Sequence, residues 1–411
     1  MRVYLDHSAT TPTDKKVLAA MEPYFSEIYG NPSSLHTFGQ EAAQAVDKAR
    51  EQIAAFLNCQ IGELVFTSGA TESDNLAIRG LIAALKAQGV DKPHIITTKI
   101  EHEAVLEPCA QLEKEGIEVT YLPVDKSGVV NTAKLKDSIK DNTVLVSVMY
   151  VNSEVGSIQP IRKIGKIITK ANEKRLREWH NTRPSKRGTR PVPIYFHTDA
   201  TQALNFLNCD TQDLLVDLLS FSGHKIYGPK GVGGLFVKQG TPLKPLQLGG
   251  HQEKNLRSGT LNVTGIVGLG AACAQLTPTK VAQTNQKIKK LRDILVEGIL
   301  TSIPKVRLNT DREVSTPAHA HFTFFGVEGE SILISLDFEG IAVSTGSACA
   351  SRSLKPSHVV LALGIPKEDA HSSIRFTLGK YTTLKEIRYV LKVLPPIIQR
   401  LRQMAPRHSG F

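Results

Sequence analysis

Lys225 follows a stretch whose residue types could build a reactive site. Residues 214–221 are mostly apolar and predict a short buried strand, and Ser222, Gly223 and His224 come directly after it. Open α/β sheets bind their ligands where strands end in this way. A lysine among small residues near a buried strand can lose contact with water, which lowers the pKa of its amine and suits it to form a Schiff base. A lone lysine in a loop is more often a solvated residue.

A second apolar stretch ends in Asp199, and Gln202 follows three residues later. A lysine and an aspartate at two neighbouring strand ends match the needs of pyridoxal phosphate. The lysine holds the aldehyde as an imine, while the carboxylate keeps the pyridine nitrogen protonated so that the ring can withdraw electrons. The two segments together therefore indicate a pyridoxal phosphate site.

Polar residues also follow two other predicted strands. After residues 64–66, a glycine loop leads into Ala70 and Thr71, and Thr71 with Asp74 forms an N-cap pattern. A helix that begins there would offer backbone N–H groups to a phosphate, although such a pattern is also typical of an ordinary capped helix. His102 follows the strand predicted at 94–98 and has a pKa range suited to proton transfer, although most loop histidines are only polar surface.

Cys349 differs from the other cysteines in its surroundings. The chain has five cysteines, and their odd number and wide spacing argue against a disulfide framework and a zinc site. Four of them lie in helix-like or strand-like sequence. Cys349 lies in a small, polar segment beside Arg352 and Lys355, whose positive charges would favour its thiolate. The alternative is an idle exposed thiol.

The composition bounds the class of protein. The chain has 411 residues, 41% of them hydrophobic and 22% charged, which is typical of a globular protein with two or three domains. It has no apolar run of the roughly 20 residues that a membrane span needs, and its start lacks the features of a signal peptide, so we expect a cytoplasmic protein. The formal net charge of +11 is compatible with an anionic cofactor, an anionic substrate or a partner protein, and we do not expect direct nucleic-acid binding as the main role.

Taken in order, these motifs resemble the cysteine desulfurases of the class-V aminotransferase family. H-T-D-A-T-Q at 197–202 and S-F-S-G-H-K-I-Y-G-P-K-G at 220–231 are similar to the family's cofactor core, and the likeness extends from Tyr4 to Phe376. The resemblance implies an α/β, aminotransferase-like pyridoxal phosphate fold of type I. Its large domain, residues 13–262, would hold a mostly parallel seven-stranded sheet. Residues 1–12 and 263–411 would form a smaller α+β domain that carries the cysteine loop.

The resemblance also implies a role for each motif residue. Lys225 would bind the cofactor and then move protons, Cys349 would take sulfur from L-cysteine as a persulfide, and alanine would leave. Asp199 would protonate the ring nitrogen, Gln202 would bond the ring oxygen, and His102 would stack on the ring. The remaining expected contacts are Arg375 with the substrate carboxylate, and Ala70, Thr71, Ser222, Gly223, His224 and, across a homodimer interface, Thr260 with the phosphate.

The sulfur would pass to an acceptor protein for iron–sulfur cluster assembly, tRNA thiolation or both, because the segment around Cys349 resembles the branch with a long cysteine loop. Two departures stand out. Ser153 replaces the asparagine that the family commonly uses near the ring oxygen, and residues 173–193 form a basic insertion. We expect that insertion to be a long loop, either simply solvated or a docking surface for an acidic partner or RNA. A selenocysteine lyase, an aminotransferase or an inactive basic scaffold remain alternatives.

Overall fold

The larger part of the molecule is built on a seven-stranded sheet in the order β2-β8-β7-β6-β5-β3-β4. In a computed structural model that describes residues 1–182, 188, 190–346 and 356–404, every pairing in this sheet is parallel except those of β8. Strands β3, β5 and β7 are buried along their whole length, as expected for a parallel sheet covered on both faces. The strands are β2 (Leu64–Thr67), β3 (His94–Thr98), β4 (Glu118–Leu122), β5 (Thr143–Ser147), β6 (Tyr195–Asp199), β7 (Leu218–Ser222) and β8 (Gly233–Val237).

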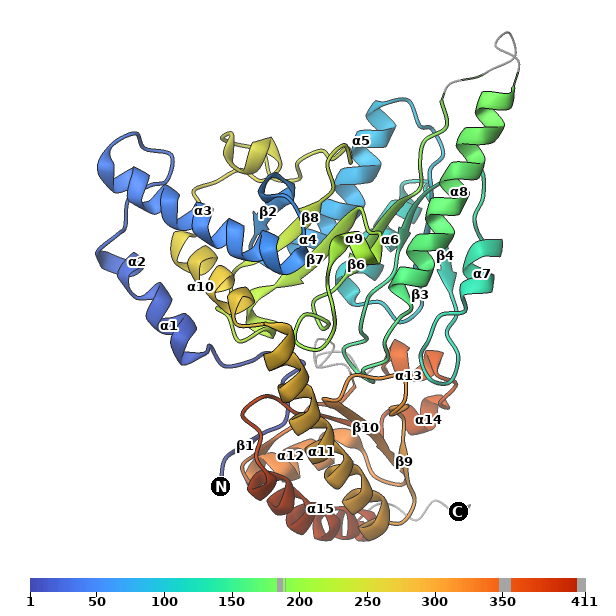
Figure 1. The fold of residues 1–411 in the computed structure, drawn as a ribbon. Helices are drawn as coiled ribbons and strands as arrows, with labels where there is room; N and C mark the ends of the chain where they lie inside the picture. Colours follow the sequence, from blue (N-terminus) through green and yellow to red (C-terminus); the bar gives the residue numbers. More distant parts are fainter. Residues whose placement is uncertain (183–187, 189, 347–355, 405–411) are drawn as a thin grey trace.

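Helices cover both faces of this sheet (Figure 1). Alternate residues of a strand point to opposite faces, so Leu219 and Phe221 pack with one layer of helices and Leu218 with the other. The first layer contains α1 (Lys15–Met21), α3 (Thr37–Leu57), α8 (Ile161–Asn181) and α10 (Val263–Ala274). The second contains α4 (Ala70–Asn75), a π-helical turn at Leu76–Gly80, α5 (Leu81–Ala87) and α6 (Glu103–Lys114). Short helices α2 (Pro23–Ser26), α7 (Thr132–Asp137) and α9 (Thr211–Leu214) lie in the connections.

A second core lies around a three-stranded antiparallel sheet in the order β12-β10-β9, below the large sheet in Figure 1. The sheet contains β9 (Val306–Leu308), β10 (His319–Phe324) and β12 (Ser373–Thr377), and it packs with α11 (Pro278–Ser302), α12 (Gly329–Phe338) and α15 (Leu384–Met404). The chain's first strand, β1 (Val3–Tyr4), pairs in parallel with β11 (Ile341–Ala342). Helices α13 (His358–Ala362) and α14 (Lys367–Ala370) lie between this core and the large sheet.

The residues that pack in each core indicate where the boundary between the two domains lies. Helix α10 packs in the first core, whereas the buried residues of α11 from Ile288 onward belong to the second. Val3 and Leu5 also belong to the second core. We therefore keep residues 1–12 with the smaller domain as a proposal, and we propose to move the other boundary from 262/263 into 275–288.

Two local expectations are corrected by the fold. The basic insertion is not a loop throughout, because α8 continues through its first part to Asn181. Pro395 and Pro396 predict that the terminal helix kinks or stops there; helix α15 does not stop at them but runs on to Met404. In α15 an apolar face, which includes Leu394 and Ile397, is buried against the second core, and this packing outweighs the cost of the two prolines. Among the described residues, no helix is long and apolar enough to cross a membrane.

Candidate active site

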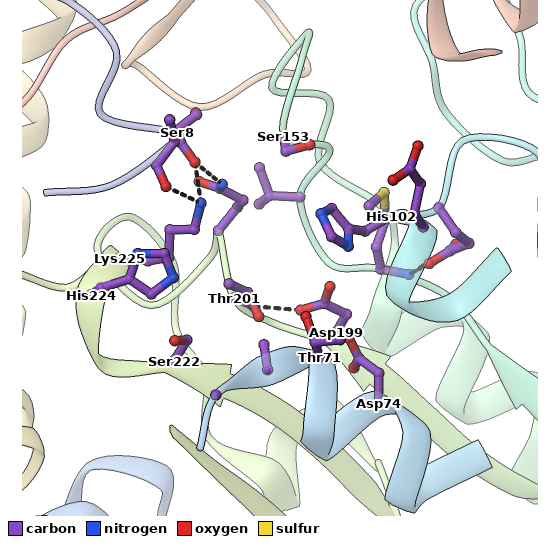
Figure 2. Close-up of a pocket in the computed structure, with 18 of the residues that line it drawn as sticks. Ser8, Thr71, Asp74, His102, Ser153, Asp199, Thr201, Ser222, His224 and Lys225 are labelled. Carbon is purple, nitrogen blue, oxygen red and sulfur yellow. Dashed lines mark hydrogen bonds between the residues drawn. The ribbon is translucent and has the colours of Figure 1, made fainter. Parts of the chain in front are cut away.

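A cavity of about 680 Å³ opens at the carboxyl ends of β5, β6 and β7. Its size is typical of a site for a small molecule. Segments far apart in the sequence line it, among them the N-terminal segment around Ser8, the start of α4, and the turn that carries Lys225 (Figure 2). Strands β6 and β7 are neighbours in the sheet, with Asp199 opposite Ser220. The two predicted strand ends therefore meet in one cavity.

The amine of Lys225 points to the N-terminal segment. It donates a hydrogen bond to the carbonyl of Ser8 and another, of 2.8 Å, to the carbonyl of Ala9. The side-chain amide of Gln202 donates to the same Ser8 carbonyl at 2.9 Å. Lys225 follows the buried strand β7 in a short 3₁₀ turn, so its backbone is fixed by the sheet. Lys225 and Gln202 thus share one backbone acceptor that no local sequence pattern links to them.

Asp199 ends β6 and is almost buried, with one carboxylate oxygen accepting the N–H of Thr201 at 2.9 Å. Two further buried carboxyl groups line the cavity nearby. Burial raises the pKa of Glu101 to about 8, against the effect of its hydrogen bonds from Thr98 and Met149. Burial, followed by the charge of Asp199, raises the pKa of Asp74 well above its usual range. Asp199 is the carboxylate of the three that keeps some exposure and is suited to pair with a protonated pyridine nitrogen.

His102 caps helix α6 and lies in the cavity wall. Its Nδ1 accepts the N–H of Ala104 at 3.1 Å, so in the neutral ring the proton is assigned to Nε2. Burial lowers the pKa of His102, and the nearby Asp199 opposes that effect. A neutral imidazole with a fixed tautomer can exchange a proton at Nε2 or stack on a flat ring.

At one end of the cavity, the side chains suit a phosphate. Helix α4 begins at Ala70 and presents the N–H groups of its first turn, and Thr71, Ser222 and His224 also line this part of the wall (Figure 2). A hydroxyl, an imidazole and a helix N-terminus form a donor set that fits an anion, while Asp199 and Lys225 offer the pyridine and aldehyde contacts. The residues present therefore fit pyridoxal phosphate.

Two of the expected phosphate contacts are not on the cavity wall of this chain. Gly223 donates its N–H to the carbonyl of Val232, and a Cβ at Gly223 would lie 2.9 Å from the carbonyl oxygen of Pro229. Gly223 is therefore required for the tight turn behind the cavity, and its amide is already engaged. Thr260 is exposed and does not line the cavity.

Arg375 lies in β12 and reaches the cavity from the smaller domain. Its guanidinium donates to Asp6 at 2.8 Å and to the carbonyl of Ser153 at 3.0 Å. Its Nε, although buried, has no hydrogen-bond partner among the described residues. Ser153 also lines the cavity, so the position that departs from the family's pattern contacts Arg375 through its backbone.

Cys349 lies outside the described residues. The residues on either side of that segment are described. Ser357 donates to Glu154 at 2.6 Å, and a Cβ at Gly346 would lie 2.8 Å from the same carboxylate oxygen. The carboxylate of Glu154, which is buried, therefore lies next to the residues on both sides of the segment that carries Cys349.

Sequence reasoning missed several groups that line the cavity. Glu101 stands beside His102 in the sequence, yet its burial carries no local signal. The N-cap pattern assigned to Thr71 and Asp74 is wrong: the cap is Gly69, and Asp74 is fully buried. The hydroxyl of Ser220 beside Asp74 lowers its pKa, but burial outweighs this effect. The adjacent His197, whose pKa burial lowers to about 3, does not supply a positive charge.

Comparisons with known proteins agree with this geometry. The model of the class-V aminotransferase family matches residues 3–175 and 186–390. Cysteine desulfurase IscS of Dictyoglomus turgidum is 47% identical over 404 residues, which is 98% of this chain and 96% of that protein. Cysteine desulfurase IscS of Clostridium botulinum strain Hall is 47% identical over 412 residues, covering 100% and 98% of the two chains.

Solved structures show the same likeness. A NifS-like protein has a TM-score of 0.87 and 37% identity, covering 98% of this chain and 100% of that one. A structure described as SspA in complex with cysteine has a TM-score of 0.76 and 35% identity, covering 93% and 100%.

Proposed function

The chain belongs to the class-V aminotransferase family, and from that premise we propose that it is a cysteine desulfurase. The reaction is L-cysteine plus the thiol of Cys349 giving L-alanine plus a persulfide on Cys349. The enzyme depends on pyridoxal phosphate, in keeping with its family. The observation that carries the proposal is the meeting of Lys225, Asp199 and His102 in one cavity, together with relatives named for this activity.

The chain's own residues would hold the cofactor at three places. Lys225 would bind the aldehyde carbon, Asp199 would pair with the pyridine nitrogen, and Gln202 would bond the ring oxygen. Ala70, Thr71, Ser222 and His224, at and near the start of α4, would hold the phosphate. When bound, the cofactor supplies an electron sink next to the substrate's α-carbon.

Protons are moved by Lys225 and His102. The carbonyls of Ser8 and Ala9 hold the amine of Lys225 at the cavity edge, where it can take a proton from the substrate and return it. His102 can exchange a proton at Nε2, because its Nδ1 is engaged by the backbone. Burial raises the pKa of both Glu101 and Asp74, which favours their neutral forms, and Asp199 is the carboxyl group that would face the ring nitrogen.

Arg375 binds the substrate carboxylate in this proposal. Its guanidinium holds Asp6 and the Ser153 carbonyl in the structure, so the substrate carboxylate shares or displaces the Asp6 contact. Displacement would occur at the junction of the two domains, since Asp6 and Arg375 belong to the smaller one and Ser153 to the larger one.

The sulfur step uses Cys349. Its thiolate attacks the sulfur of the substrate, so that an S–S bond forms and the Cβ–S bond of the substrate breaks. The electron pair stays on the substrate, where protonation gives alanine, so no outside oxidant is needed. Two positive side chains, Arg352 and Lys355, are close in sequence and favour the thiolate. A reducing, cytoplasmic compartment keeps this thiol free and belongs to the same proposal.

A homodimer is part of this proposal. Large apolar side chains with exposed fractions above one half occur in α1, α2, the segment before α3, the first turn of α3 and the loop after β8. They are Leu18, Phe25, Tyr29, Leu35, Phe38 and Leu248. Exposed apolar side chains on this scale mark an interaction surface. A second copy packed there would cover them and bring its exposed Thr260 toward the phosphate end of the cavity.

A separate acceptor protein takes the sulfur from Cys349 in this proposal, for iron–sulfur cluster assembly, tRNA thiolation or both. The support is the likeness to relatives named IscS, and it is a likeness of the whole chain.

The test measures alanine and sulfide formed from L-cysteine in the presence of a reductant. Wild type should turn over, and both Cys349→Ala and Lys225→Ala should be inactive. Full activity of Cys349→Ala would refute the persulfide step and favour a selenocysteine lyase or an aminotransferase. An inert wild type that still binds the cofactor would refute catalysis and favour a scaffold.

A further inference from the structure

Helix α8 presents a row of positive charges on its outer face. Five cations recur at intervals of three and four residues, which places them on one side of a helix. They are Lys163, Lys166, Lys170, Lys174 and Arg177, and all five are exposed. At 1.5 Å per residue, the row is about 21 Å long. We call it the α8 row.

The α8 row is almost free of compensating acid. Within it, Lys174 has a carboxylate within 4 Å in the described part of the chain, at 3.7 Å from Glu178. Other acidic residues nearby are Glu173 on α8 itself, Asp213 on α9, which pairs with Arg162 at 3.0 Å, and the exposed Asp137 on α7. Helix α7, which packs on α8, adds the exposed Lys134 and Lys136 close by. The surface therefore has a local excess of positive charge, because most of its cations have no carboxylate within ion-pair distance in the described part of the chain.

The distal end of α8 lies outside the part of the chain that the family model matches; of the α8 row, Arg177 lies there and the four lysines lie within the matched part. The family model matches residues 3–175 and resumes at 186, so it leaves out the last turn of the helix and the segment after it. In Figure 1 this end of α8 projects past the edge of the sheet, and no residue of the α8 row lines the catalytic cavity. The surface therefore serves neither the cofactor nor the substrate.

The projecting helix is anchored rigidly. Asn172 forms two hydrogen bonds with the backbone of Ile194, of 2.9 and 2.8 Å, just before β6. Arg175 donates to the carbonyls of Lys140, Thr143 and Val192. These contacts fix the helix on the face opposite the α8 row. The backbone that carries the row is therefore already ordered and need not fold when it binds a linear polyanion.

The composition of the surface favours nucleic acid over an acidic protein. Protein interfaces have an apolar or aromatic centre and are poor in lysine, whereas Lys and Arg side chains can contact phosphates without any apolar centre. No large apolar side chain of α8 is among the exposed ones in the described part of the chain. We propose that the α8 row binds the phosphate backbone of a nucleic acid strand, as an interaction surface separate from the catalytic cavity.

The test measures binding of the full-length holoenzyme to a fluorescein-labelled single-stranded RNA of 20 nucleotides by fluorescence anisotropy. Five phosphate contacts on a single strand give a slope of about −3.5 for log K against log salt, so affinity falls about 100-fold from 50 to 200 mM salt. The triple variant Lys166→Gln, Lys170→Gln, Lys174→Gln leaves two contacts. Its slope should be about −1.4, a loss of only about 7-fold over the same range.

A matched variant controls for net charge. Lys280→Gln, Lys289→Gln and Lys290→Gln remove the same three charges from exposed positions on α11 and should keep the wild-type slope. Equal slopes for the two triple variants would overturn the proposal, because binding would then follow net charge. Displacement of the RNA by poly-glutamate at equal charge concentration would also overturn it, in favour of an acidic protein. Both triple variants should keep wild-type desulfurase activity, so this test does not depend on the proposed reaction.

Discussion

Replacing Glu101 with glutamine should make the protein more stable, and increasingly so as pH rises. Glu101 is completely buried, and burial raises its pKa to about 8 from an ordinary value near 4.5. The folded state therefore keeps a proton that the unfolded chain releases above pH 4.5. Folding stability is lost as pH rises through that window and becomes level above pH 8. Glutamine is neutral at every pH and does not incur this loss.

The size of the stability difference follows from the pH range between the two pKa values of Glu101. Each pH unit of difference is worth about 1.4 kcal/mol, so the full difference between variant and wild type is about 5 kcal/mol above pH 8. In a chain of this length, 1 kcal/mol moves the melting temperature by roughly 1 °C. The glutamine keeps an oxygen that can accept the hydrogen bonds from Thr98 and Met149, so the cavity wall is preserved.

The assay follows thermal unfolding of the cofactor-loaded protein between pH 5 and pH 9. Wild type and Glu101→Gln should melt within about 1 °C of each other at pH 5, and the variant should melt roughly 5 °C higher at pH 9. Glu103→Gln is the matched control, since it removes an exposed carboxylate two residues away. A melting difference that does not grow with pH, or that grows equally in Glu103→Gln, would refute the argument that Glu101 is held neutral by burial.

Three further predictions test other parts of the structure. His102→Gln should lower kcat by about 10²-fold to 10⁴-fold with retained cofactor absorbance, and near-normal steady-state rates would exclude it from proton transfer. Gly346→Ala should slow persulfide formation on Cys349, because the new methyl group would lie 2.8 Å from the Glu154 carboxylate. Mass spectrometry after one turnover measures the persulfide, and a wild-type yield at early times would contradict this prediction. Leu35→Asp with Leu248→Asp should shift the protein to a monomer in light scattering, and an unchanged mass would place the dimer interface elsewhere.

The sequence alone determined the local elements and the key chemical pair. Short apolar runs predicted strands at 64–66, 94–98 and 214–221, where the structure has β2, β3 and β7. Asp199 and Lys225 each end such a run, and the rule that ligands bind at strand ends brought them together before any coordinates. These predictions succeeded because they depend on neighbours within a few residues.

Local patterns failed where distant contacts decide the outcome. Helix α15 continues through Pro395 and Pro396 because its apolar face is buried against the second core, and α8 extends to Asn181 because Asn172 and Arg175 anchor it to the backbone near β5 and β6. The residues that stabilise these two helices lie far from them in the sequence.

Only the tertiary structure decided the electrostatics of the cavity. Lys225 contacts the carbonyl of Ser8 across 217 positions, and Arg375 contacts Asp6 across 369. Burial of Glu101 changes its protonation, yet the residues beside it in the chain do not reveal that burial. Hydrogen bonding and the loss of solvent depend on what packs around a group in space. The sequence therefore indicated which groups would carry the proposed chemistry, and the packing of two cores around them decided their hydrogen-bond partners and their burial.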